Sequence, residues 1–118
     1  MEPKVLTDNE IIEAKKSLYD LNTYQEMTTL FKMFGDGTRL KILTVLSKQP
    51  CSVNDLSEIL GMSQSAISHQ LSKLRKANLV KFDKKGLNVF YSLMDDHVMT
   101  IFRQALDHVL EECNHFHD

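Results

Sequence analysis

Apolar residues recur at helical spacing along most of the first 76 positions of the chain. Two pairs with the spacing of a capping box, Thr7 with Glu10 and Thr23 with Glu26, predict the starts of two helices in the N-terminal part. The first of these helices is expected to carry apolar residues as far as Leu21. The N-terminal part is therefore predicted to be a pair of amphipathic helices.

A dense apolar set predicts a third, mostly buried helix over residues 38–47. Ser52 with Asp55, and then Ser63, are caps for two shorter helices that meet at Gly61. The second short helix is expected to turn three apolar residues inward: Ile67, Leu71 and Leu74. Two short helices joined by a glycine turn are typical of a helix-turn-helix, which we place at about 52–76.

After Asn78 the spacing changes to the alternation of a β-strand. Lys84-Lys85-Gly86 supplies turn chemistry, and residues 89–91 are predicted to return as the second strand of a basic hairpin, or wing, over about 79–92. Asp95 places negative charge where it favours a helix start, which predicts a last helix over about 95–113. The expected fold class is mainly α with a small β-hairpin, in a single domain over residues 1–118.

Charge is segregated along the chain although the net charge is only −2. Residues 39–88 carry nine basic and three acidic side chains, a net charge of +6. The flanking segments are acidic, with −3 over residues 1–38 and −5 over residues 89–118. A basic middle is the pattern of a phosphate-contacting surface, and the acidic flanks argue against a protein that coats any polyanion.

Composition excludes several classes of protein. No apolar run approaches the roughly 20 residues of a membrane span, and the first 16 residues lack the features of a secretory signal. Cys51 and Cys113 form no CxxC pattern, which fits a reducing compartment, so a cytoplasmic location is expected. Nothing resembles a nucleophile with a base and an orienting group, so we expect no enzyme.

The predicted second helix of the helix-turn-helix can enter a major groove, with short polar side chains on its outer face. Lysines of the hairpin would contact phosphates or a minor groove and fix position without reading sequence. The predicted contacts to double-stranded operator DNA are Gln64, Ser65, Ser68, His69, Lys73, Lys81, Lys84 and Lys85.

The same residues carry a family resemblance. Asp55-Leu56, the string from Ser63 to Leu71 (SQSAISHQL) and Leu74-Arg75 resemble the ArsR/SmtB family of bacterial metal-responsive repressors. The stretch from Gly35 to Arg39 is similar to that family's entry to its third helix, and the resemblance extends from about Met27 to Glu111. It implies a winged helix-turn-helix homodimer, with N- and C-terminal helices at the dimer interface, that represses its operator and releases it on binding metal.

Four side chains of the predicted last helix are candidate metal ligands. His97 and His108 are 11 positions apart, about 16 Å along a helix, so they cannot bind one ion within one chain. If two copies of the helix pack antiparallel, the pair Asp95 and His97 of one faces the pair His108 and Glu111 of the other. Two imidazoles with two carboxylates suit zinc and also accept cobalt. By resemblance, these four positions match the family's zinc-sensing site.

The sequence departs from the family where thiolate-based sensors carry a CxC motif, because residues 52–54 are Ser-Val-Asn and Cys51 lies one place early. Cys113, His115 and His117 could add ligands for nickel or cobalt. Two alternatives to the zinc-released repressor stay open. One is a DNA-binding regulator with a redox switch at Cys51, and the other is a metal-buffering protein that uses the C-terminal Cys and His.

Overall fold

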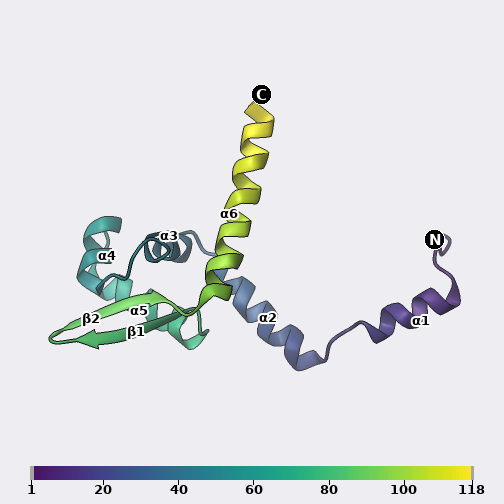
Figure 1. The fold of residues 1–118 in the computed structure, drawn as a ribbon, viewed down its shortest axis with the longest axis horizontal. Coiled ribbons are helices and arrows are strands. Elements are labelled where there is room, and N and C mark those ends of the chain that lie inside the picture. Colours follow the sequence, from purple (N-terminus) through teal and green to yellow (C-terminus); the bar gives the residue numbers. More distant parts are fainter. Residues whose placement is uncertain (1, 118) are drawn as a thin grey trace.

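The computed structural model describes the backbone of residues 2–117 and the side chains of residues 2–111. Six helices and one antiparallel hairpin follow one another along this part of the chain (Figure 1). The elements are α1 Asp8–Lys16, α2 Leu21–Phe34, α3 Gly37–Leu46, α4 Val53–Leu60, α5 Gln64–Lys76, β1 Val80–Lys85, β2 Asn88–Leu93 and α6 Asp96–His117. The mainly helical fold class with a small hairpin is confirmed.

The hydrophobic core lies between α3, α4, α5 and the base of the hairpin (Figure 1). The predicted inner face of α5 is confirmed, since Ile67, Leu71 and Leu74 are at most 1% exposed. The other members of the core are Ile42, Leu43, Leu46, Cys51, Leu56, Leu79, Val80, Leu93, Val98 and Phe102. The last two lie in the first turns of α6, so the core anchors the beginning of that helix.

Caps that the sequence predicts set the ends of α4 and α5. The Ser52 backbone N–H donates to Asp55 Oδ2 at 2.9 Å, and the Asp55 N–H donates to Ser52 Oγ at 3.0 Å. Gly61 ends α4 with a φ of 65°, a left-handed conformation that glycine adopts at little cost. Ser63 Oγ then accepts the Ala66 N–H at the start of α5. These local bonds turn the chain sharply between the two helices.

The strands of the hairpin are longer and its turn is tighter than the sequence predicts. Lys84 and Lys85 still belong to β1, and Lys85 pairs with Asn88, so only Gly86 and Leu87 form the turn. The reason is that Gly86 alone provides the positive φ, 64°, that a two-residue loop with glycine at its first position requires. Cys51 extends the sheet by one bridge, in which its N–H donates to the Tyr91 carbonyl oxygen at 3.0 Å.

Two sequence predictions in the N-terminal part are wrong. Helix α2 begins at Leu21 and not at Thr23, because Asp20 is the cap and its Oδ1 accepts the Thr23 N–H at 2.8 Å. Helix α1 ends at Lys16, so Leu21 is not part of it. The capping box of Thr7 and Glu10 is confirmed by reciprocal hydrogen bonds.

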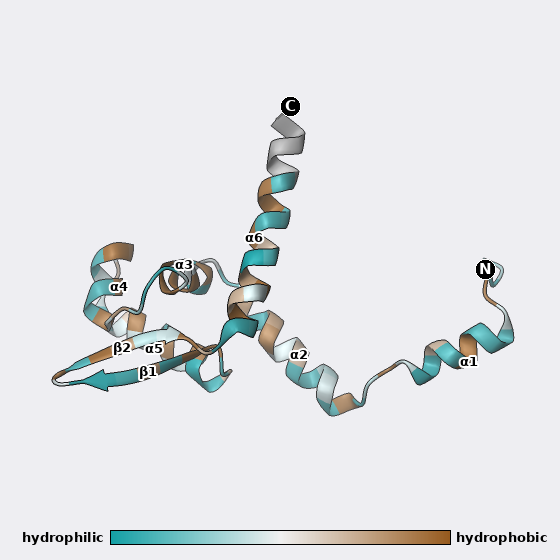
Figure 2. Ribbon diagram, in the orientation of Figure 1, coloured by the Kyte–Doolittle hydropathy of each residue, from teal (hydrophilic) through white to brown (hydrophobic). Residues whose placement is uncertain are grey.

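The outer helices α1, α2 and α6 give the chain an extended shape (Figure 1). The radius of gyration is 19.3 Å, against about 13–14 Å for a compact chain of this length. In α1 and α2 no residue is buried. Helix α6 projects from the core, and its described side chains form alternating apolar and polar bands (Figure 2). Across the described residues, no helix combines the length and apolarity needed to cross a membrane.

Candidate DNA interface and metal ligands

Helix α5 presents the predicted base-reading residues on its exposed face. Gln64, Ser65, Ser68, His69 and Lys73 are all exposed, whereas Ile67, Leu71 and Leu74 of the same helix are buried. Polar side chains on one accessible face can donate to and accept from base edges in a major groove.

Sequence reasoning missed Asn54, which holds the side chain of Gln64 by a hydrogen bond. Gln64 Nε2 donates to Asn54 Oδ1 at 2.9 Å, so Asn54 of α4 orients the amide of Gln64 at the start of α5. No local pattern signals this contact, because the two residues lie ten positions apart on different helices.

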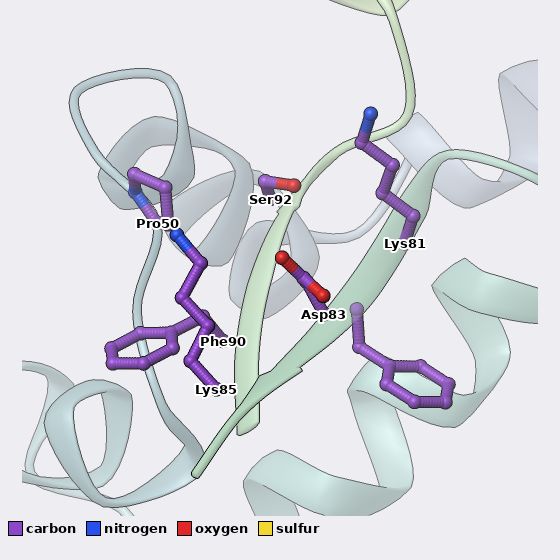
Figure 3. A pocket seen from close by; sticks show the side chains of 7 residues that line it. Pro50, Lys81, Asp83, Lys85, Phe90 and Ser92 are labelled. Atoms are coloured by element: carbon purple, nitrogen blue, oxygen red, sulfur yellow. The ribbon is translucent and has the colours of Figure 1, made fainter. Parts of the chain in front are cut away.

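The three wing lysines do not share a face of the hairpin. Lys84 shares one face with Phe82, while Lys81 and Lys85 share the other with Asp83, because side chains alternate along a strand. Figure 3 shows Asp83 between Lys81 and Lys85 at a shallow hollow. The hollow is lined by Pro50, Lys81, Phe82, Asp83, Lys85, Phe90 and Ser92. Only the end of the hairpin therefore brings lysines of both faces near one another.

A cation and two aromatic rings join α5, the recognition helix of the helix-turn-helix, to the wing. The Arg75 guanidinium lies 4.1 Å from the centre of the Phe82 ring, and the Phe82 and Tyr91 rings are 6.0 Å apart. A guanidinium over an aromatic face is attractive and keeps its charge available to solvent. This contact fixes β1 against the end of α5, and no sequence signal pairs the two residues.

The first pair of candidate metal ligands lies at the beginning of α6. His97 Nδ1 is 3.6 Å from Asp95 Oδ2, and Asp95 Oδ1 accepts the Val98 backbone N–H at 3.1 Å. That hydrogen bond from Val98, with a smaller contribution from His97, lowers the pKa of the Asp95 carboxyl. Asp95 thus caps α6 with one oxygen and turns the other toward an imidazole that is 93% exposed.

The second pair lies three helical turns farther along α6. His108 and Glu111 are exposed, and the 11 positions from His97 to His108 correspond to about 16 Å of helix. Within the described residues, no three His, Cys, Asp or Glu side chains come close enough to hold a metal ion. The structure thus brings Asp95 to His97 but does not join the two pairs in one chain. The side chains of Cys113, His115 and His117 lie outside the described residues.

Cys51 lies in the core and not at an accessible site. Its side chain belongs to a residue that is 3% exposed, and Sγ contacts the Gln49 carbonyl oxygen at 3.5 Å. A buried thiol is poorly accessible to oxidants, which disfavours a redox switch at this residue.

Two capped helices, a polar recognition face and a following hairpin define a winged helix-turn-helix DNA-binding protein. Comparison with known proteins places this chain within that class. Residues 36–81 match the family described as "Bacterial regulatory protein, arsR family". The chain belongs to this family and is a DNA-binding transcriptional regulator.

Relatives that cover most of the chain include two transcriptional regulators of bacteria. It is 37% identical over 102 residues to a transcriptional repressor SmtB homolog of Synechocystis sp., which covers 86% of this chain and 77% of the relative. It is 39% identical over 89 residues to the HTH-type transcriptional regulator NmtR of Mycobacterium tuberculosis, with 75% and 74% covered.

The fold is also found in a solved structure from Mycobacterium bovis, a homodimeric winged helix-turn-helix DNA-binding domain. The TM-score is 0.78 at 22% identity, with 86% of this chain and 96% of that chain covered. At this identity the likeness concerns the fold alone, and it agrees with the winged helix-turn-helix described above.

Proposed function

We propose that this protein is a zinc-responsive repressor that binds operator DNA as a metal-free homodimer. In this proposal zinc binds between the C-terminal helices of two protomers and releases the DNA, with cobalt and nickel as alternative effectors. One domain over residues 1–118 carries both the DNA-reading and the metal-sensing parts. The observation that carries the proposal is the separation of two ligand pairs, Asp95 with His97 and His108 with Glu111, along one exposed helix.

A dimer is supported by apolar side chains that remain more than half exposed in the described part of the chain. Phe31 of α2 is 58% exposed, and Val109 and Leu110 of α6 are 53% and 51% exposed. Exposed apolar surface on successive turns of projecting helices is typical of a protein interface. The N-terminal helices and α6 are therefore the proposed dimer surface.

Two-fold symmetry would complete the metal site. If the two α6 helices pack antiparallel, Asp95 and His97 of one protomer come opposite His108 and Glu111 of the partner subunit. Because a two-fold axis repeats every contact, two equivalent sites of two imidazoles and two carboxylates follow. Four ligands of these types suit tetrahedral zinc, which would supply a cross-link between the helices. The 37% identity to an SmtB homolog, a transcriptional repressor, supports the repressor part of the proposal.

DNA contact in the proposal uses the residues predicted from sequence. Gln64, Ser65, Ser68, His69 and Lys73 read bases from α5, while Lys81, Lys84 and Lys85 contact phosphates from the wing. A repressor dimer must hold its two recognition helices at the spacing of successive major grooves. A cross-linked pair of α6 helices would favour a dimer in which this spacing no longer fits the operator.

Operator release by metal tests the proposal. We expect zinc to weaken binding of the protein to a labelled operator, selected from a random-sequence library, by a factor in the usual range of about 5–150. The measurement is fluorescence anisotropy at fixed salt, repeated with cobalt and nickel, together with metal stoichiometry, for which we expect two ions per dimer. Unchanged operator affinity in zinc contradicts the release mechanism.

Single-residue variants locate the sensing site. His97→Gln and His108→Gln should bind the operator as the wild type does and fail to respond to zinc, because both residues lie away from the reading face. Asp96→Asn is the matched control, since this neighbouring carboxylate is not a predicted ligand. Deletion of residues 113–118 should preserve the zinc response. Loss of all metal binding in that deletion would instead favour a metal buffer.

A further inference from the structure

One arginine connects three helices of the described chain. Arg39 lies in the first turn of α3 and is half-buried, and its own N–H donates to the cap residue Asp36. Its guanidinium reaches away from α3 in two directions, toward the end of α2 and toward α5.

In the first direction, Arg39 donates hydrogen bonds to the C-terminal end of α2. Arg39 Nε donates to the Met33 carbonyl oxygen at 3.0 Å, and Nη2 donates to the Lys32 carbonyl oxygen at 3.3 Å. The last carbonyls of a helix lack the usual N–H partner four residues on and form the negative end of the helix dipole. The Lys32 oxygen also accepts the Gly35 N–H at 3.1 Å. A cation that donates to two of these carbonyls fixes where α2 ends relative to α3.

The second direction reaches the recognition helix. Arg39 Nη1 donates at 3.3 Å to Oε1 of Gln70, a half-buried residue of α5 that lies 31 positions away. The guanidinium is a rigid planar fork, so its three bonds constrain one another in direction. A movement of the end of α2 relative to α5 would therefore strain these hydrogen bonds, and so would a movement of α5 relative to α2.

We propose that Arg39 is a positioning residue that fixes recognition helix α5 to the end of α2, so that dimer geometry reaches the DNA-reading face. The part of the proposal that concerns zinc rests on the proposed function above. Arg39 need not contact DNA in this role. It acts through Gln70. The link should matter most when the operator demands one spacing between the two reading heads, the segments of residues 37–93 in the two protomers.

Two ratios of operator affinity test the link in the full-length protein. The first compares the selected operator with one that carries an extra base pair between its half-sites, without metal. The second compares the selected operator with and without zinc. Arg39→Lys keeps the charge but loses the fork, and Gln70→Met loses the acceptor. In both variants the two ratios should move toward 1, by up to about tenfold, the scale of one hydrogen bond to a charged group.

Controls separate positioning from simple stability. Gln70→Glu keeps an acceptor for Arg39 and should retain both ratios, even if its added charge weakens DNA binding overall. Lys41→Gln, an exposed change on the same helix, should also retain them. Wild-type ratios in Arg39→Lys and Gln70→Met, with only a lower unfolding midpoint, would overturn the proposal.

The two ratios also separate this proposal from the proposed function. If zinc leaves the operator affinity of the wild type unchanged, the release mechanism fails, and the spacing ratio alone decides on Arg39. If the wild type tolerates the extra base pair without loss of affinity, its reading heads are not held at a fixed spacing and the proposal for Arg39 is wrong.

Discussion

The reading head, residues 37–93, and the outer helices α1, α2 and α6 solve the burial of apolar side chains differently. In the reading head, Ile42, Leu43 and Leu56 are fully buried against neighbouring elements of the same chain. In the outer helices, Phe31 and Leu110 remain more than half exposed. The core of the protein is thus formed mainly by the reading head, whereas the outer helices contribute few buried side chains and leave Phe31 and Leu110 more than half exposed. In the proposed function, DNA reading and dimer assembly therefore use separate parts of a small protein.

Helix α6 is the outer helix whose first turns pack into the core of the reading head. Val98 and Phe102, in its first turns, are 5% and 7% exposed and pack into the core. Farther along, the helix has no covering in the described chain, and Val109 is 53% exposed. The pair Asp95 and His97 therefore lies at the anchored end, and His108 lies on the projecting part. A cross-link between the two ends of partner helices would act directly on the reading head.

The largest expected effect is on the free energy of unfolding, when a leucine is replaced by alanine in each of the two regions. Leu43→Ala should lower the free energy of unfolding by about 2–5 kcal/mol, because it leaves a cavity in a packed core. Leu110→Ala, at a side chain that is 51% exposed, should cost little in dilute protein and more as protein concentration rises. Urea unfolding followed by circular dichroism at several concentrations measures both. Equal, concentration-independent losses would mean that Leu110 packs within its own chain.

The second prediction concerns assembly alone. Leu110→Asp should raise the dimer dissociation constant about 100-fold or more, because it places a carboxylate in the proposed apolar interface. The matched control is Leu87→Asp at the wing turn, where the leucine is 99% exposed. Analytical ultracentrifugation should show a dimer for the control and a monomer for Leu110→Asp at low micromolar concentration. A dimeric Leu110→Asp protein would exclude this part of α6 from the interface.

The regular features of the reading head could be predicted from sequence because they depend on neighbours along the chain. The caps at Ser52 and Ser63 and the inner face of α5 follow from spacings of three and four residues. The start of α2 was predicted wrongly for a related reason. Asp20 and Thr23 are both good caps three residues apart, and the carboxylate of Asp20 accepts both the N–H and the hydroxyl of Thr23.

Contacts between distant residues could not be predicted in this way. Arg39 and Gln70 lie 31 positions apart, and the distance between Arg75 and Phe82 depends on how the hairpin packs against α5. The pairing of Asp95 with His97 follows from their separation of two residues at a helix start. A four-ligand site requires the position of a second chain, which no pattern within one sequence specifies.

The smallest expected effect concerns the capping box, which occurs once in each of the two regions. Capping boxes begin α1 and α4, and in each the carboxylate accepts a backbone N–H, from Thr7 for Glu10 and from Ser52 for Asp55. These hydrogen bonds are the main reason that the pKa of each carboxyl is lowered. A lowered pKa in the folded state stabilises the protein above the pKa of the unfolded chain. The stabilisation is lost as the pH falls through the folded value.

Only the capping box of α4, Ser52 with Asp55, should therefore affect the global unfolding of the protein in acid. Asp55→Asn should destabilise the protein slightly at neutral pH and converge with the wild type in acid, because the variant has no carboxylate to protonate. Glu10→Gln should leave the global transition unchanged and reduce only the helicity of α1, since no residue of α1 is buried. Tryptophan is absent, so tyrosine fluorescence and circular dichroism follow the acid titrations. If Glu10→Gln shifted the global transition as Asp55→Asn does, α1 would unfold together with the core, and the division between the two regions would not extend to stability.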